Sequence, residues 1–188
     1  MKKTKISLIG FVIALLISCG RSAGKQEANA IGFKAIEGIL KSKFGDKAHY
    51  TDLTITYNET IGNIVGVTVT DAPESLKMGQ WTLSQGNWVQ TSDITLEVPQ
   101  GTKAADFMFQ LGNAINLGQL GALVEKSKEQ LTAEKDIEDP SLHMALIKMP
   151  KNGNRDKTEY TVMLKPENGG TTFTFNYDLD GALIKMDY

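Results

Sequence analysis

Eight short strand-like segments, bounded by turns and in part alternating apolar with polar residues, constrain the fold of this chain more than any other feature of its sequence. In the first, Leu53, Ile55 and Tyr57 alternate with threonines. Side chains of a β-strand point to opposite faces in turn, so a period of two is typical of strands with one buried and one wet face. The strands that we expect are 53–57, 65–69, 80–83, 88–98, 142–149, 159–164, 171–177 and 182–188.

A period near 3.6 precedes each group of four strands and predicts helices. In the first half, Lys34, Glu37 and Lys41 fall away from the apolar stripe, and Gly45 follows as a C-cap. The apolar residues that share one face there are Phe33, Ile36, Leu40 and Phe44.

The second half begins with a predicted pair of helices. The later helix runs through 120–131 and carries charged residues on its other side, among them Glu125 and Lys126. The residues that form the apolar face of the earlier helix are Ala104, Phe107, Met108, Leu111 and Ile115.

The order of a helix and four strands therefore occurs twice. The turns at Gly86 and Gly181 hold the same place in the two halves, at an offset near 95 residues. We predict an α+β fold with two related units, 30–100 and 101–188. Each unit would pack a helix or helix pair on its own four-stranded antiparallel sheet.

The first 18 residues have the parts of an export signal. Three lysines precede a twelve-residue, mostly apolar run over 6–17, which is shorter than the roughly 20 residues that span a bilayer as a helix. The sequence Leu16-Ile-Ser-Cys19 then resembles the bacterial lipobox, which implies cleavage before Cys19 and a lipid on its sulfur. A plain secretory signal and an uncleaved anchor remain as alternatives.

The residues after Cys19 predict a short flexible tether over 19–29, since they are small and polar. In some lipoproteins that this leader resembles, an acidic cluster just after the cysteine marks export to the cell surface. This chain has no such cluster, so the resemblance implies a periplasm-facing anchor. Without the three leader lysines, 17 basic residues face 22 acidic ones, so the mature chain carries about five negative charges. With no basic stripe, nucleic acid is not expected as a partner.

The C-terminal stretch 159–188 resembles the PepSY-type modules of bacterial exported proteins. The resemblance rests on Tyr160-x-Val162 and on the run Phe173-x-Phe-x-Tyr-Asp-x-x-Gly181-x-Leu183. A tandem of such units also resembles the architecture of the beta-lactamase inhibitor protein, although the disulfides of that protein are absent here. The resemblance implies protein binding, including peptidase inhibition, and implies no role for a particular residue.

One loop has the oxygen spacing of an EF-hand calcium site. Its candidate ligands are Asn176, Asp178, Asp180 and Asp187, with Gly181 at the sixth position. Both flanks alternate with period two, however, and a β-hairpin accounts for the same residues without a metal. We therefore expect a turn, and keep calcium as the weaker alternative.

Few other residues suggest chemistry. His49 and His143 each lie just before or at the start of a predicted strand and fit no zinc spacing, so we expect them on the surface at the edge of a sheet. Trp81 shares a face with Leu83, which favours the core. Trp88 is the candidate interface residue, because tryptophan is enriched at binding hot spots.

These features together predict a membrane-anchored, periplasm-facing envelope lipoprotein without enzyme activity. Its expected partners are the membrane, through the lipid on Cys19, and an envelope protein or peptide that it binds and could inhibit. We expect no other cofactor. The alternatives are a structural, small-ligand or calcium-binding domain and, as a third, an unrecognised hydrolase.

Overall fold

Helix α1 (Ala30–Phe44) begins and ends where the sequence provides caps. The Asn29 side chain accepts a hydrogen bond from the Gly32 N–H, which satisfies one of the donors that the first turn leaves free. At the other end, Gly45 has a φ of 91° and donates to Lys41 O. The apolar stripe that the sequence predicts is on the buried side and includes Phe33, Ile36 and Leu40.

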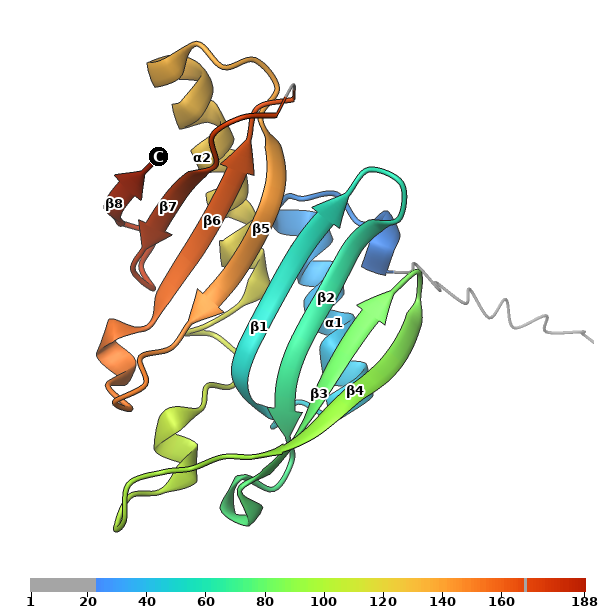
Figure 1. Cartoon of the computed structure of the whole chain (residues 1–188), viewed down its shortest axis with the longest axis vertical. Helices are drawn as coiled ribbons and strands as arrows, with labels where there is room; N and C mark the ends of the chain where they lie inside the picture. The colour runs from blue at the N-terminus through green and yellow to red at the C-terminus, as the bar shows by residue number, and fades with distance from the viewer. Residues whose placement is uncertain (1–22, 168) are drawn as a thin grey trace, which may run out of the picture.

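The computed structural model describes residues 23–167 and 169–188, and its strands form one sheet. Cys19 and the leader lie outside the described residues. Each strand is antiparallel to its neighbours in the order β4-β3-β2-β1-β5-β6-β7-β8 (Figure 1). The strands are β1 (His49–Asn58), β2 (Gly62–Thr70), β3 (Lys77–Ser84), β4 (Asn87–Thr95), β5 (Ser141–Lys148), β6 (Glu159–Lys165), β7 (Phe173–Tyr177) and β8 (Leu183–Asp187).

This single eight-stranded sheet shows that the expectation of two units, each with its own four-stranded sheet, is wrong. The α+β class itself holds. Strands β1 and β5 join the halves, with Leu53 opposite Ile147 and Ile55 opposite Ala145. Left separate, each half would expose one more strand edge with unpaired backbone groups, and pairing β1 with β5 removes both edges.

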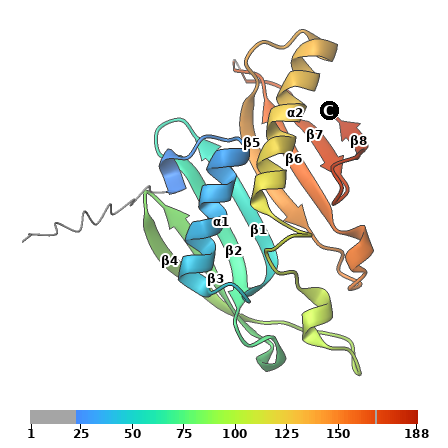
Figure 2. The same cartoon turned by 180° about the vertical axis from the view of Figure 1, so that it is seen from behind.

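Both helices lie on the same face of the sheet, side by side (Figure 2). α1 covers the first half, and α2 (Leu117–Lys135) covers the second. The residues between them and the sheet form one continuous core across both halves. Its largest fully buried side chains include Tyr50, Tyr160, Tyr177, Phe33, Phe109 and Phe175.

The predicted helix with an apolar face from Ala104 to Ile115 is wrong. Only a 3-10 turn, η3 (Ala104–Phe107), forms there. The chain then extends so that Phe109 and Tyr50 exchange two backbone hydrogen bonds of 2.8 Å, and their rings stack at 5.7 Å. The apolar residues with helical spacing in this stretch therefore pack into two different clusters. Phe109 and Leu111 enter the main core, whereas Met108 joins a small second cluster with Met78.

Candidate functional site

One face of the sheet carries no helix in the described part of the chain, and it faces the viewer in Figure 1. Its residues alternate along each strand with those that pack under α1 and α2. We call it the open face. One row of it crosses all eight strands through Val89, Thr82, Gly66, Thr54, Leu146, Thr161, Asn176 and Lys185. A second row includes Ile64, Thr56, Met144, Met163, Thr174 and Asp187.

Both rows are uncharged except at the β8 end, where Lys185 and Asp187 lie. Those two side chains pair at 2.6 Å. The next row of the open face carries Lys148 of β5 opposite Glu159 of β6. Leu146, Met144 and Met163 are half-buried, because neighbouring side chains on a flat surface shield one another. Such a surface combines apolar area with hydroxyl groups that can donate and accept hydrogen bonds.

A hydrogen bond between two side chains of the open face holds part of this surface in place without a partner. Thr161 Oγ1 donates to Asn176 Oδ1 at 2.9 Å, and both side chains are more than 90% buried. Nearby, Gly66 leaves space for the Thr54 side chain, since a Cβ at Gly66 would lie 2.9 Å from Thr54 Oγ1. The open face is therefore ordered by its own residues.

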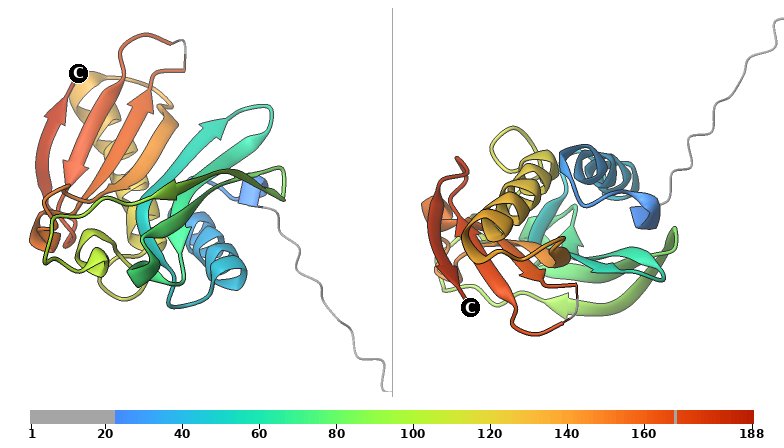
Figure 3. Two further views of the ribbon diagram at one scale, coloured as in Figure 1. Left: turned by 60° about the horizontal axis from the view of Figure 1, so that its bottom comes forward. Right: turned by 90° about the horizontal axis from the view of Figure 1, so that it is seen from above.

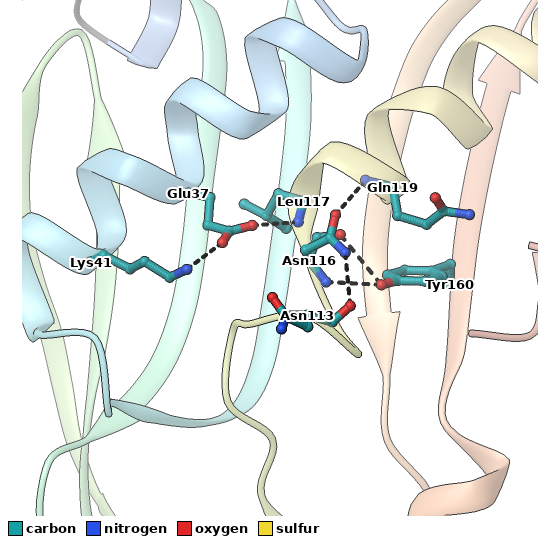
Figure 4. Close-up of polar contacts among 7 residues, drawn as sticks. All are labelled: Glu37, Lys41, Asn113, Asn116, Leu117, Gln119 and Tyr160. Carbon is teal, nitrogen blue, oxygen red and sulfur yellow. Dashed lines mark hydrogen bonds and ion pairs between the residues drawn. The ribbon is translucent and has the colours of Figure 1, made fainter. Parts of the chain in front are cut away.

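A polar junction lies on the opposite side of the sheet, where the two helices meet (Figure 4). Glu37 is its centre and is only 8% exposed. One carboxylate oxygen accepts from the Leu117 N–H at 2.8 Å, and the other contacts Lys41 Nζ at 2.5 Å. The sequence placed Glu37 off the apolar stripe, and no signal in it shows that the second helix would cover this residue.

The contact has a counterpart two helical turns away. Glu125 of α2 accepts from the Ala30 N–H of α1 at 3.0 Å. Each helix therefore provides a glutamate for the first turn of the other, where an anion is also favoured by the helix dipole. This exchange fixes how the helices of the two halves lie against each other.

Two tyrosines extend the junction into the sheet. Tyr160 Oη accepts from the Asn116 N–H at 3.0 Å, and burial followed by the nearby Glu37 charge raises the pKa of Tyr160 despite this hydrogen bond. Burial, followed by the same charge, also raises the pKa of Tyr50, whose Oη has no hydrogen-bond partner among the described residues. Both phenols stay protonated at neutral pH. The junction therefore joins the two halves through hydrogen bonds.

The calcium candidates do not converge. The Asp178 carboxylate accepts from the backbone N–H groups of Asp180 and Ala182, which closes the turn between β7 and β8. Asn176 is bonded to Thr161, and Asp187 pairs with Lys185. The turn that the sequence predicted is present, and no group of three His, Cys, Asp or Glu side chains among the described residues could hold a metal ion.

Trp88 and Trp81 lie on the helix side of the sheet, both against Phe44. Their ring centroids are 5.0 and 5.8 Å from that of Phe44, in edge-to-face geometry. Trp88 is half-buried, and its packing on the main core gives it a structural role in addition to any role at an interface. The predicted interface residue is therefore not part of the open face.

The histidines lie far from each other. Antiparallel pairing sets Thr56 of β1 opposite Met144 of β5, which places His143 opposite Tyr57. His49 is eight residues before Tyr57, so it lies about 26 Å from His143 along the strands. Burial, and then the Lys165 charge, lower the pKa of His143. The two side chains cannot act on one substrate atom.

A groove forms where the N-terminal segment crosses the sheet. It encloses about 860 Å³ between residues 24–29, the β1–β2 turn, Gln85 and the start of β5. Residues 24–29, which the sequence assigned to a flexible tether, pack against the sheet here. Asn63 Nδ2 donates to Gln26 O at 2.6 Å, and a Cβ at Gly62 would overlap Gly24 O.

No protein-family model and no curated protein matches this sequence. Among solved structures, the chain is similar to the crystal structure of a "putative lipoprotein (CD1622)" from Clostridium difficile 630. The two share 13% sequence identity over 81% of this chain and 89% of that chain, with a TM-score of 0.49. No helix in the described part of this chain is long and apolar enough to cross a bilayer.

Proposed function

We propose that this chain is a lipid-anchored protein of the bacterial cell envelope that binds a protein or peptide through its open face. Cys19 would carry the lipid, and the folded part would face the periplasm. The chain would catalyse no reaction itself and would act by occupying a surface of its partner, including by inhibition. The observation that carries the proposal is the row of the open face that crosses all eight strands and is uncharged on every strand but β8, where it ends in Lys185.

The composition of this row supports a protein partner. The centres of protein interfaces are poor in charged residues and rich in methionine and aromatic residues, with polar groups towards the rim. The open face has Met144, Leu146 and Met163 near its middle and a charged pair at its β8 end. The hydroxyls of half-buried threonines on this face, such as Thr56 and Thr174, offer hydrogen bonds without the desolvation cost of a charge.

Calcium binding is a weaker reading, because backbone N–H groups already use the Asp178 carboxylate. Hydrolysis is weaker as well, because the distance between His49 and His143 supports no shared acid–base pair. Neither alternative has an observation that favours it over binding.

Photo-crosslinking in intact cells tests the proposal. A benzophenone amino acid is placed at Met163 on the open face and, as the matched control, at Ala122 on the exposed side of α2. We expect a discrete adduct of defined mass from Met163 and none from Ala122. Equal labelling from both positions, or no adduct from Met163, would contradict the proposal.

A further inference from the structure

The first described residues of the chain lie beside two turns of the sheet (Figures 1 and 3). The 3-10 turn η1 (Ala23–Lys25) packs on β2 and β3. It lies next to the β1–β2 turn, and Gly24, Thr60 and Gln85 line the same groove. The described chain thus begins at this end of the molecule, which we call the hairpin end and define by η1, residues 57–62 and Gln85.

The chain that separates the hairpin end from Cys19 is short. Because residues 23–29 pack against the sheet, only four residues of chain run from Cys19 to Ala23. At 3.3–3.6 Å per residue, that length spans at most about 14 Å. A domain of this size measures roughly 40 Å across, so a lipid on Cys19 could not reach the membrane from most orientations of the body.

We propose that the hairpin end lies against the bilayer that holds the Cys19 lipid, so that the open face projects away from the attachment point and remains accessible. This inference rests on the lipid anchor proposed above. The surface suits a lipid headgroup layer, because Tyr57 is 37% exposed and Ile61 is half-buried there. A tyrosine with one apolar and one wet side fits the boundary between lipid and water.

The charges at the hairpin end indicate whether electrostatic attraction would hold it against the bilayer. The groove at the hairpin end contains two lysines and three glutamates, namely Lys25, Lys128, Glu27, Glu59 and Glu125. With no net positive charge, it offers no electrostatic attraction to anionic lipids. The short covalent connection must therefore supply the orientation, and the contact should be insensitive to salt.

Quenching by lipids tests this orientation on the lipidated full-length protein in vesicles of phosphatidylethanolamine and phosphatidylglycerol. A fluorophore is attached at Thr60→Cys on the hairpin end or at Lys151→Cys in the β5–β6 turn, at the far end of the molecule. Nitroxide groups on the lipid headgroups should quench the Thr60 label several-fold more than the Lys151 label. Equal quenching of both labels would overturn the inference.

Two glycine substitutions then test whether the packing of residues 23–29 against the sheet sets the orientation of the folded part on the bilayer. Gly62→Ala would collide with Gly24 O, and releasing residues 23–29 would lengthen the connection to about 38 Å. We expect the difference in quenching to fall towards zero. Gly101→Ala is the matched control, because Gly101 has a similar positive φ but nothing within 4 Å, and the difference should persist there.

An insertion provides a second test that holds even if Gly62→Ala disturbs the fold. About twelve Gly and Ser residues between Ser22 and Ala23 add roughly 20 Å of reach without touching the body. The difference in quenching should again fall, and its persistence would overturn the inference. Protein that fails to float with vesicles would instead refute the lipid anchor, so the two failures are distinguishable.

Discussion

The Glu37 carboxylate accepts a hydrogen bond from the Leu117 N–H at 2.8 Å, although 80 positions separate the two residues in the sequence. Glu37 belongs to the helix of the first half, and Leu117 begins the helix of the second. Because Glu125 makes the reverse contact with Ala30, the helices are linked in both directions. The single sheet and this exchange make the two halves one structural unit.

Replacing Glu37 should destabilise the fold. Glu37→Ala leaves the Leu117 N–H buried without an acceptor, which costs about 1–3 kcal/mol. Glu37→Gln keeps an acceptor oxygen and should lose roughly 1 kcal/mol. Urea denaturation followed by circular dichroism measures both. Lys34→Ala, on the exposed side of the same helix, is the control, and a Glu37→Ala variant as stable as this control would contradict the role of Glu37.

Lys41 should matter much less than Glu37. Its ammonium pairs with Glu37, but its side chain is 28% exposed, and such pairs contribute about 0–1 kcal/mol. Lys41→Ala should therefore shift the urea midpoint only slightly. A loss as large as that of Glu37→Ala would show that the ion pair, and not the bond to Leu117, stabilises the junction.

The two glutamate contacts should act independently. Leu117 and Glu125 are about 12 Å apart along α2, and effects at such distances usually add to within about 0.5 kcal/mol. We expect Glu125→Ala to cost less than Glu37→Ala, because Glu125 is exposed. A double-mutant cycle with both alanines measures the coupling, and strong non-additivity would argue against two separate contacts.

The shared sheet predicts one cooperative unfolding transition. Ala145 is fully buried opposite Ile55 at the β1–β5 boundary. Ala145→Leu should overpack this boundary and cost about 1–3 kcal/mol, lowering the midpoint of the whole transition. Tryptophan fluorescence reports the first half, which contains Trp81 and Trp88, and far-ultraviolet circular dichroism reports both halves. Two separate transitions would indicate halves that unfold independently.

His143 should titrate below 6.5, its ordinary pKa, since burial and then Lys165 disfavour its charged form. A base whose pKa is lower in the folded state loses stability as pH falls from its unfolded pKa towards its folded pKa. His143→Gln should remove this loss on the acidic side of pH 6.5. Lys165→Ala should raise the His143 pKa in an NMR titration, and an unchanged midpoint would refute the influence of Lys165.

The sequence predicts most local structure but not how the pieces join. Alternation in Leu53, Ile55 and Tyr57 is a property of neighbouring residues, so it locates β1 without tertiary information. The pairing of Leu53 with Ile147 depends on which strand edges meet, and periodicity contains no such information. The expectation of two separate sheets is therefore wrong, because it missed the pairing of β1 with β5. All eight strands are nevertheless present close to their predicted positions.

Other errors have similar causes. Phe109 and Leu111 fit a helical stripe in spacing, yet the Phe109 backbone pairs with Tyr50, 59 residues earlier. Glu37 resembles a solvated charge until α2 covers it. The open face itself could be anticipated only as the polar side of each strand, and its continuity over eight strands depends on the β1–β5 pairing.

Binding through the open face is the central claim, and an affinity measurement tests it most directly. With the partner captured at Met163 in purified form, titration calorimetry compares Leu146→Glu with Ala122→Glu. Leu146→Glu places a charge in the middle of the open face, where its row is uncharged, and should weaken binding about 100-fold, roughly 2.7 kcal/mol, whereas Ala122→Glu should bind like the unaltered protein. Equal affinities for the two variants would contradict the claim.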